Sequence, residues 1–550
     1  MKVGVIQSRI VVGDFDGNSS RLVDGYTEAV AQGAEIVVAP EDAIAGYCEG
    51  DQRLYPSFLV RHDAAFDTLC RAVGDVPLVV GITEKNSGAG KPLRNSAVFI
   101  ENGKVLHRQS KTNLATDTVF NDYRWYEPNA EPVAIFAFRG MTCAMLVCQD
   151  LWETYDAAHG EHYFRRNPVS ELKGKGVDLI LVPNASPYYF GKGRERYEMV
   201  RAAQATIGGA VLYANYAGGH DELVFDGRSF IMNAKGRVVG AAKAFAHDEV
   251  LVGELDGPAV DYPFEDGVTD LGEALIVGLR DYVEKSGVKS VILGLSGGID
   301  SALCAALAVR ALGPSRVIGI RMPSQYSSQG SLDDADMLAK NLRIRCDTVP
   351  IKDIYQSVAS PLERTIGFGT PSYAGDVTEE NVQARARGLI VMAYANKYGA
   401  MGIATGNKSE FSVGYATLYG DMCGGYALIK DVYKMDVYAL SEWINKDGEI
   451  IPRNSIEKPP SAELRPDQKD TDSLPDYPVL DAILKGLVEN FEGRDELVRQ
   501  GFDPAVVEKV IAMTDRAEFK RRQAPPGPIV SSEGLAWLNR QYPITTKFRP

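Results

Sequence analysis

A glycine-rich hexapeptide near the middle of the chain has the composition of a phosphate-binding loop. It runs Ser296-Gly-Gly-Ile-Asp-Ser301 and follows the apolar stretch Val291–Leu293. Glycines let a backbone approach an anion closely, and the first N–H groups of a following helix point toward that anion. An aspartate beside phosphates is unfavourable unless a cation lies between them, so Asp300 indicates Mg²⁺. A turn that only joins a strand to a helix is the alternative, but the full pattern in this setting favours nucleotide chemistry.

The loop is not of the Walker type, because no Gly-Lys-Ser/Thr follows it. It resembles the pyrophosphate loop of enzymes that split ATP into AMP and pyrophosphate, usually to adenylate a substrate. All six histidines lie between His62 and His247, so the second half of the chain has no histidine base. Adenylation needs none, since Mg²⁺ and lysines can stabilise the leaving pyrophosphate. The adenylate then needs an attacking group, and ammonia is a good one.

The first half of the chain offers residues that could release ammonia from glutamine, which requires a nucleophile, a base and an oxyanion site. Cys148 is predicted to end the strand TCAMLVC, Glu41 to end EIVVAPE, and Lys111 opens KTNLATD. If these positions meet at one sheet edge, Glu41 takes the thiol proton and Lys111 favours thiolate and oxyanion. The alternation of a strand puts Cys143 on the face opposite Cys148, as a core thiol. Taken singly, each residue has a simpler interpretation without catalysis: a glutamate or a lysine usually faces solvent, and a cysteine in a strand usually lies in the core.

A second cysteine resembles the nucleophile of a glutaminase but lacks the required setting. Gly46-Tyr-Cys48-Glu-Gly50 spells G-x-C-x-G, a nucleophile elbow that belongs between a buried strand and a helix. No strand directly precedes it here, and proline follows too soon for a helix. The class of glutaminase with an N-terminal cysteine is excluded, because residue 2 is lysine. We therefore expect Cys48 to be dispensable.

The pattern of elements predicts two α/β domains. Residues 1–255 alternate short β-rich runs with helical stretches, which predicts a layered α/β domain. Residues 256–266 are polar and contain Pro and Gly, as in a linker. Residues 267–550 begin with a βαβ rhythm, which predicts a parallel sheet. Residues 453–477 are dense in charge and proline and are predicted to form a long mobile loop.

Composition narrows the possible partners and location. The 550 residues carry a formal net charge of −14, which argues against a nucleic-acid partner. No apolar run approaches the ~18 residues of a membrane span, so no membrane partner is expected. The seven cysteines are scattered without CxxC pairs, which favours reduced thiols in the cytoplasm and disfavours a zinc or iron–sulfur site.

Several blocks then carry a family resemblance. VVAPEDAIAGY, KTNL and CQDLW resemble the nitrilase superfamily, whose Glu, Lys and Cys fall on Glu41, Lys111 and Cys148. With GLSGGIDSA, ENVQARARGLIVM and ATGNKSEF, nearly the whole chain resembles the glutamine-dependent NAD(+) synthetase family. This resemblance implies a nitrilase-like α-β-β-α sandwich followed by a Rossmann-like parallel-sheet ATP pyrophosphatase (PP-loop) domain.

The resemblance also assigns binding residues. For glutamine they are Ser186, Lys192 and Asp117, which stands where the family has a tyrosine. For ATP they are Gly294, Leu295, Ser296, Gly297, Gly298, Ile299, Asp300, Ser301 and Thr405. For nicotinic acid adenine dinucleotide (deamido-NAD) they are Asn381, Arg385, Glu410 and Lys520, and for Mg²⁺ they are Asp300 and Glu410.

The implied reaction is ATP-dependent amidation of deamido-NAD with ammonia from L-glutamine, giving NAD, AMP, pyrophosphate and glutamate. The resemblance further implies an internal ammonia tunnel and a homo-oligomer. Three alternatives remain open at this point. One is an amide-forming enzyme with another carboxylate substrate, which would lack the ENVQAR and GNKSEF blocks. Another is a non-catalytic nitrilase-like module with free ammonia as donor. The third is a tRNA-thiolating enzyme, which would need paired cysteines and a basic face.

Overall fold

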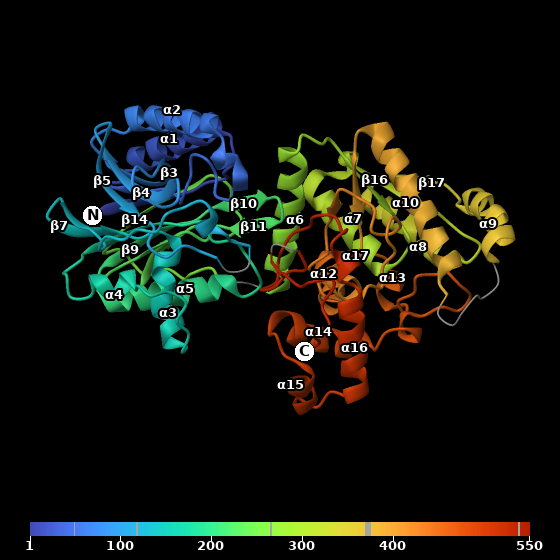
Figure 1. Ribbon diagram of the computed structural model, residues 1–550. Coiled ribbons are helices and arrows are strands. Elements are labelled where there is room, and N and C mark those ends of the chain that lie inside the picture. Colours follow the sequence, from blue (N-terminus) through green and yellow to red (C-terminus); the bar gives the residue numbers. More distant parts are fainter. Residues whose placement is uncertain (49, 117–118, 265–266, 369–375, 537–538) are drawn as a thin grey trace. The chain divides into compact units, whose positions relative to one another are not determined.

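The computed structural model describes residues 1–48, 50–116, 119–264, 267–368, 376–536 and 539–550. The chain divides into two compact units, Met1–Glu265 and Asp266–Pro550. Figure 1 shows the helices and strands of each unit and labels many of them. Within the described residues no helix combines the length and the apolar character needed to cross a membrane.

The first unit contains two six-stranded sheets. The strands of the first sheet, in spatial order, are β14 (Glu249–Glu254), β1 (Lys2–Gln7), β2 (Val37–Val38), β3 (Leu78–Lys85), β4 (Leu93–Glu101) and β5 (Lys104–Ser110). Those of the second are β13 (Val238–Ala241), β12 (Phe230–Met232), β9 (Ala210–Ala214), β8 (Leu179–Pro183), β7 (Met141–Met145) and β6 (Ile135–Phe138). A separate ribbon pairs β10 (Ala217–His220) with β11 (Leu223–Asp226).

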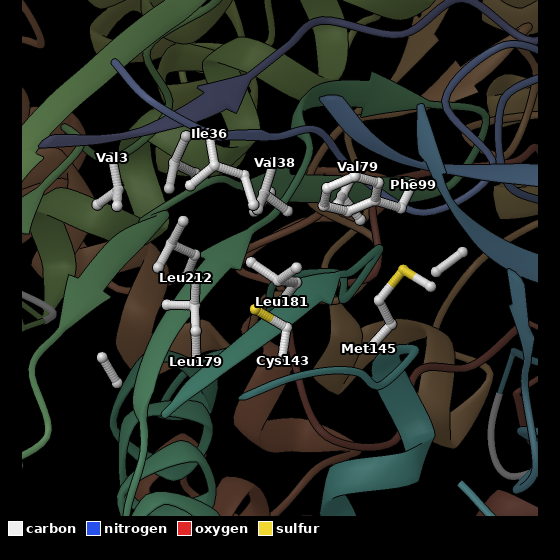
Figure 2. Close-up of a cluster of buried hydrophobic side chains, with 14 of the residues drawn as sticks. Val3, Ile36, Val38, Val79, Phe99, Cys143, Met145, Leu179, Leu181 and Leu212 are labelled. Atoms are coloured by element: carbon white, nitrogen blue, oxygen red, sulfur yellow. The ribbon is translucent and has the colours of Figure 1, made fainter. Parts of the chain in front are cut away.

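Helices cover the outer faces of both sheets. α1 (Phe15–Ala31) and α2 (Pro56–Ala72) lie on the first sheet, and α3 (Trp152–Ala158), α4 (Pro168–Leu172) and α5 (Lys192–Ile207) lie on the second (Figure 1). Apolar side chains of the two inner faces meet between the sheets, as Val79 and Phe99 do with Met145 and Leu181 (Figure 2). Each such side chain contributes about 1.5–3 kcal/mol by burial. The predicted α-β-β-α sandwich is therefore confirmed.

The second unit is built on a five-stranded parallel sheet. Its strands, in spatial order, are β17 (Arg345–Thr348), β16 (Val317–Arg321), β15 (Val291–Gly294), β18 (Met401–Ala404) and β19 (Tyr426–Ala427). The chain runs from β15 outward to β17 and then returns to β18 on the other side of β15. The strand order thus reverses at β15, and open α/β sheets bind ligands at the carboxyl end of the strand where this happens. The predicted phosphate loop begins at that end.

The helices of the second unit are α6 (Val268–Lys285), α7 (Ile299–Leu312), α8 (Gln329–Leu342), α9 (Lys352–Ile366), α10 (Thr378–Tyr398), α11 (Lys408–Val413), α12 (Lys434–Ile444), α13 (Arg453–Glu457), α14 (Tyr477–Glu489), α15 (Arg494–Arg499), α16 (Pro504–Arg516) and α17 (Glu518–Arg521). They pack around this sheet, except that α14, α15 and α16 pack on one another in a separate buried cluster (Figure 1). The predicted Rossmann-like parallel sheet is confirmed.

Three expectations about local structure need correction. β2 ends at Val38, so Glu41 lies in the turn beyond it rather than at the strand end. β7 ends at Met145, and Cys148 is the first residue of a 3₁₀ turn, η3 (Cys148–Leu151). Because the strand alternation stops before Cys148, this thiol and Cys143 contribute to the same buried cluster rather than to opposite faces.

The segment 453–477 is also not a single loop. It contains helix α13 and the 3₁₀ turn η5 (Asp470–Asp472). The Glu463 carboxylate accepts hydrogen bonds from the hydroxyl groups of Ser328 and Ser331, at 2.9 and 2.7 Å. The side chain of Ser455 donates to the backbone oxygen of Gly297 at 2.9 Å. These contacts join the segment to helix α8 and to the phosphate loop.

Candidate active sites

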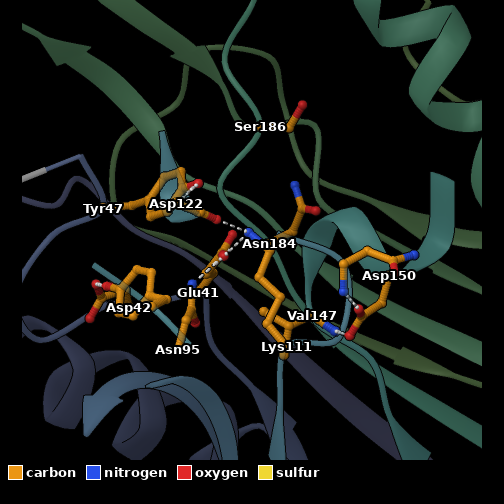
Figure 3. A network of polar contacts seen from close by, with 12 residues as sticks. Glu41, Asp42, Tyr47, Asn95, Lys111, Asp122, Val147, Asp150, Asn184 and Ser186 are labelled. Carbon is orange, nitrogen blue, oxygen red and sulfur yellow. Dashed lines mark hydrogen bonds and ion pairs between the residues drawn. The ribbon is translucent and has the colours of Figure 1, made fainter. Parts of the chain in front are cut away.

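The first candidate site brings together the three residues predicted to release ammonia. Lys111 Nζ lies 2.9 Å from Glu41 Oε1, and both side chains are fully buried (Figure 3). Asn95 also donates to Glu41 Oε1, at 2.7 Å, so neither Asn95 nor Lys111 bonds to Oε2. Burial and the charge of Glu41 raise the pKa of the Cys148 thiol, so this thiol is neutral at pH 7. A neutral thiol needs a base before it can attack, and Glu41 Oε2 is available.

The turn that carries Glu41 is held in place by hydrogen bonds to its backbone carbonyl groups. Tyr216 donates from its hydroxyl to the carbonyl oxygens of Glu41 and Asp42, at 2.5 and 3.0 Å. Asp42 has a φ of 44°, in the left-handed region. The turn packs on Gly81 of β3, where a Cβ atom would lie 2.4 Å from the Glu41 Cα atom. Glycine is required there because any side chain would displace Glu41.

A second buried carboxylate, which the sequence did not point to, completes the surroundings of Lys111. Asp122 Oδ2 lies 2.8 Å from Lys111 Nζ, and Tyr47 donates to Asp122 Oδ1 at 2.9 Å. Burial disfavours the lysine charge, but Asp122 and Glu41 outweigh it and hold the pKa of Lys111 well above its usual value. Burial raises the pKa of Glu41, and Asp122 raises it further. Asp122 thus keeps Lys111 charged while making Glu41 a stronger base.

Replacing Asp122 with asparagine should therefore change the pH dependence of glutamine hydrolysis. Glu41 then faces Lys111, Asn95 and Cys148 without the repelling carboxylate, so its pKa falls. Glu41 must be ionised to take the thiol proton, so the acidic limb of kcat/KM should move to lower pH. A weaker base should also lower kcat by about tenfold or more.

The measurement is the pH profile of glutamate release, with Asp51→Asn as the control. Asp51 is exposed, and its carboxylate accepts a hydrogen bond from Arg124 at 2.8 Å. Arg124 belongs to the same 3₁₀ turn as Asp122, η2 (Asp122–Arg124). If the acidic limb of the kcat/KM profile lies at the same pH in Asp122→Asn as in the parent chain, the Asp122 carboxylate does not raise the pKa of Glu41.

Two predicted glutamine contacts lie near this site, and the third is not described. Ser186 follows β8, is buried, and its N–H donates to Asn215 Oδ1 at 2.8 Å. Lys192, the first residue of α5, pairs with Glu195 at 2.9 Å, and its Nζ lies 3.8 Å from the ring centre of Trp152. Trp152 directly follows the turn that begins at Cys148. Asp117 lies outside the described residues.

The second candidate site is the glycine loop at the end of β15. The Gly298 N–H donates to Ser296 Oγ at 3.1 Å, and the hydroxyls of Ser296 and Ser301 are 3.0 Å apart. Gly297 has a φ of 81°, and a Cβ atom there would lie 2.2 Å from the Ser331 carbonyl oxygen. Helix α7 begins at Ile299, so its free N–H groups face this loop. The arrangement suits an anion.

Two predicted carboxylates meet beside the loop around a lysine. Lys434 Nζ lies 2.5 Å from Asp300 Oδ2 and 3.5 Å from Glu410 Oε1. Asn407 donates to Asp300 Oδ1 at 2.8 Å and caps the helix that carries Glu410. Burial and the charge of Asp300 raise the pKa of Glu410. Sequence reasoning missed both Lys434 and Asn407, although the capping box Asn407-x-x-Glu410 is a readable signal.

The remaining predicted substrate contacts gather on the segment that follows α11. The Lys520 ammonium donates to the carbonyls of Gly414 and Ala416, at 2.8 and 2.7 Å. Arg385 donates to the Leu418 carbonyl at 3.2 Å, and Asn381 accepts from the Thr417 hydroxyl at 2.8 Å. Thr405 directly follows β18. Asn381 and Arg385 from α10 and Lys520 from α17 thus contact the same short stretch, which follows the helix that carries Glu410.

Comparison with known proteins agrees with this pair of units. The carbon–nitrogen hydrolase family matches residues 2–261 and the NAD synthase family matches residues 271–524. The glutamine-dependent NAD(+) synthetase of Acinetobacter baylyi is 39% identical to the chain over 557 residues, which cover 100% of this chain and 99% of that protein. The chain belongs to the glutamine-dependent NAD(+) synthetase family.

Further relatives support the assignment. The glutamine-dependent NAD(+) synthetase of Synechocystis is 39% identical over 100% of this chain and 99% of its own. The solved structure of the Acinetobacter baumannii enzyme, a complex with adenosine diphosphate, is 36% identical and matches with a TM-score of 0.76, over 99% of this chain and 98% of that one. The family is one of ligases that use ATP, so the predicted enzyme class is confirmed.

Proposed function

We propose that the chain amidates the carboxylate of deamido-NAD with ATP, using ammonia that Glu41, Lys111 and Cys148 release from L-glutamine. The products are NAD, AMP, pyrophosphate and glutamate. The observation that carries the proposal is the contact of the buried Lys111 ammonium with Glu41, in the unit that matches the carbon–nitrogen hydrolase family. The cysteine needed to complete the reaction lies beside the same glutamate.

In the first site Glu41 takes the Cys148 proton as the sulfur attacks the amide carbon of glutamine. Lys111 stabilises the negative charge that develops on the amide oxygen. Glu41 then returns the proton to the leaving nitrogen, so that ammonia departs and a thioester to Cys148 remains. Water, deprotonated by Glu41, attacks this thioester, and glutamate and the thiol are regenerated. Ser186 and Lys192 hold glutamine in place.

In the second site the N-terminus of α7 and the glycine loop hold the ATP phosphates. The carboxylate of deamido-NAD attacks the α-phosphorus and pyrophosphate leaves. Ammonia then attacks the acyl carbon of the adenylate, and AMP leaves with its bonding electrons. Asn381, Arg385 and Lys520 position the dinucleotide, and Thr405 contacts the nucleotide.

The carboxylates of Asp300 and Glu410 fit Mg²⁺, because carboxylate oxygens are the ligands it prefers and phosphate oxygens would complete its shell. Both carboxylates lie within reach of one cation, the Lys434 ammonium. When bound, Mg²⁺ would neutralise charge on the phosphates. The internal ammonia tunnel, the homo-oligomer and the cytoplasmic location stay predictions.

The experiment is to incubate the purified chain with ATP, Mg²⁺ and deamido-NAD, with glutamine or ammonium as alternative donors. NAD and AMP in equal amounts with both donors are expected. Product with ammonium alone would favour a non-catalytic first unit. Product with neither donor would reject deamido-NAD as the substrate and favour an amide-forming enzyme for another carboxylate.

A further inference from the structure

A buried carboxylate outside the three residues of the first site joins the two segments that carry Lys111 and Cys148. Asp150 Oδ1 accepts the N–H groups of Thr112 and Asn113, at 2.9 and 2.8 Å. Its other oxygen, Oδ2, accepts the Val147 N–H at 3.1 Å. Figure 3 shows this bond to Val147 beside Lys111. Thr112 directly follows Lys111, and Val147 directly precedes Cys148.

Burying the Asp150 carboxylate costs free energy, because its charged form loses contact with water. Asp150 is fully buried, and burial raises its pKa to about 6. An ionised carboxylate in such a place is tolerated only when hydrogen bonds replace its lost water. Three backbone N–H groups do so from two segments that share no strand pairing, because β5 ends at Ser110 and β7 at Met145.

The bond to Val147 also supports the backbone of Cys148. Cys148 has a φ of 45°, in the left-handed region that residues with a side chain rarely adopt. Such a conformation costs about 1–3 kcal/mol and persists only where the surroundings impose it. The Asp150 side chain closes the turn η3 by reaching back to the N–H that precedes it.

We propose that Asp150 is a positioning residue of the glutamine site, which holds the Lys111 ammonium and the Cys148 thiol in register by bonding both backbones at once. The inference rests on the proposed function of that site. Only a carboxylate can do this, because all three partners are donors and both carboxylate oxygens accept. In Asp150→Asn the amide NH₂ would face the N–H of Val147 or the N–H groups of Thr112 and Asn113. Two donors cannot bond to each other, so the hydrogen bonds to one of the two segments must be lost.

The test compares Asp150→Asn with Asp178→Asn in the full-length chain. Asp178 is exposed and accepts the Thr142 N–H at 2.8 Å, at the opposite end of β7 from Cys148. Four quantities are measured: kcat for glutamine, KM for glutamine, the rate of synthesis with ammonium, and the iodoacetamide alkylation rate of Cys148, followed by peptide mass.

In Asp150→Asn, kcat for glutamine should fall about 100-fold, since a shift of about 1 Å in a catalytic group costs that much. KM should stay within about threefold, because the hydrogen bonds of the Asp150 carboxylate go to the backbone of Thr112, Asn113 and Val147 and not to a residue proposed to hold glutamine. Synthesis with ammonium should match that of Asp178→Asn, and Cys148 should be alkylated about tenfold more slowly, because displacement of Lys111 weakens the thiolate.

Equal kcat values in the two variants would overturn the proposal, and so would a parallel loss of both modes of synthesis, which would mark Asp150 as a residue of fold stability. If the parent chain hydrolyses no glutamine, the proposed function fails. The alkylation rates, which need no substrate, then decide the role of Asp150 alone: slower alkylation supports it and equal alkylation rejects it.

Discussion

Replacing Cys148 with alanine is expected to abolish NAD formation with glutamine and to leave NAD formation with ammonium unchanged. The substitution removes the sulfur that attacks the amide, and Cys148 is the thiol whose pKa responds to the charges of Glu41 and Lys111. Loss of a nucleophile lowers turnover by about 1,000-fold or more. Since ammonium enters after this step, the second site should work at its full rate.

The measurement is the initial rate of NAD formation with each donor, and Cys48→Ser is the matched control. Cys48 is half-buried and lies ten residues beyond the end of β2 at Val38, before the 3₁₀ turn η1 (Gly50–Leu54), so it lacks the strand-to-helix setting of a nucleophile elbow. The control should keep both rates within about twofold. Equal rates with glutamine in Cys148→Ala and the parent chain would reject Cys148 as the nucleophile. Selective loss of glutamine use in Cys48→Ser would assign the role to Cys48 instead.

The sequence predicted the first site through residues that follow strands, and its error there is instructive. Glu41 and Cys148 were placed at strand ends, yet both strands stop three residues earlier. Apolar composition continues past the end of a strand when the following turn is itself buried, as it is around Ala43 and Val147. Periodicity therefore located the residues but not the backbone that positions them.

Other site residues carry no local signal at all. Asp122 is recognised only because its carboxylate meets Lys111, and Lys434 only because its ammonium meets Asp300. Lys434 lies 134 positions from Asp300 in the sequence, so only the folded chain brings them together. Asn407 differs, because its cap on α11 follows a known spacing and could have been found. Motifs predict residues that act with their sequence neighbours and miss partners supplied by another element.

The parallel sheet was easier to predict, because each of its early strands is a short apolar run followed by a helix. Val291–Gly294 and Val317–Arg321 form β15 and β16 as expected. The order of the strands was not available from this pattern, yet it decides where the ligand binds. Once β18 is seen to return beside β15, the glycine loop falls at the reversal of strand order, which makes its assignment independent of the motif.

Replacing Asp300 with alanine should abolish synthesis with both donors, in contrast to Cys148→Ala. Its carboxylate is the proposed Mg²⁺ ligand at the phosphate loop, and it also contacts Lys434 and Asn407. Loss of one group that stabilises the transition state costs about 100-fold or more in kcat. Glutamate release in the first unit should persist, because Asp300 and its partners Lys434 and Asn407 all belong to the second unit.

The control is Asp353→Ala, which removes an exposed aspartate from the first turn of α9, as Asp300 occupies the first turn of α7. In both variants a helix loses a carboxylate from its first turn, and the interaction of that carboxylate with the helix dipole stabilises the helix by about 0.3–1 kcal/mol. Comparison of the two variants therefore separates the effect on helix stability from the effect on ATP chemistry. Initial rates of AMP formation with ammonium decide the matter. Turnover retained in Asp300→Ala would refute a role at the phosphates, whereas equal losses in the two variants would trace the effect to helix stability.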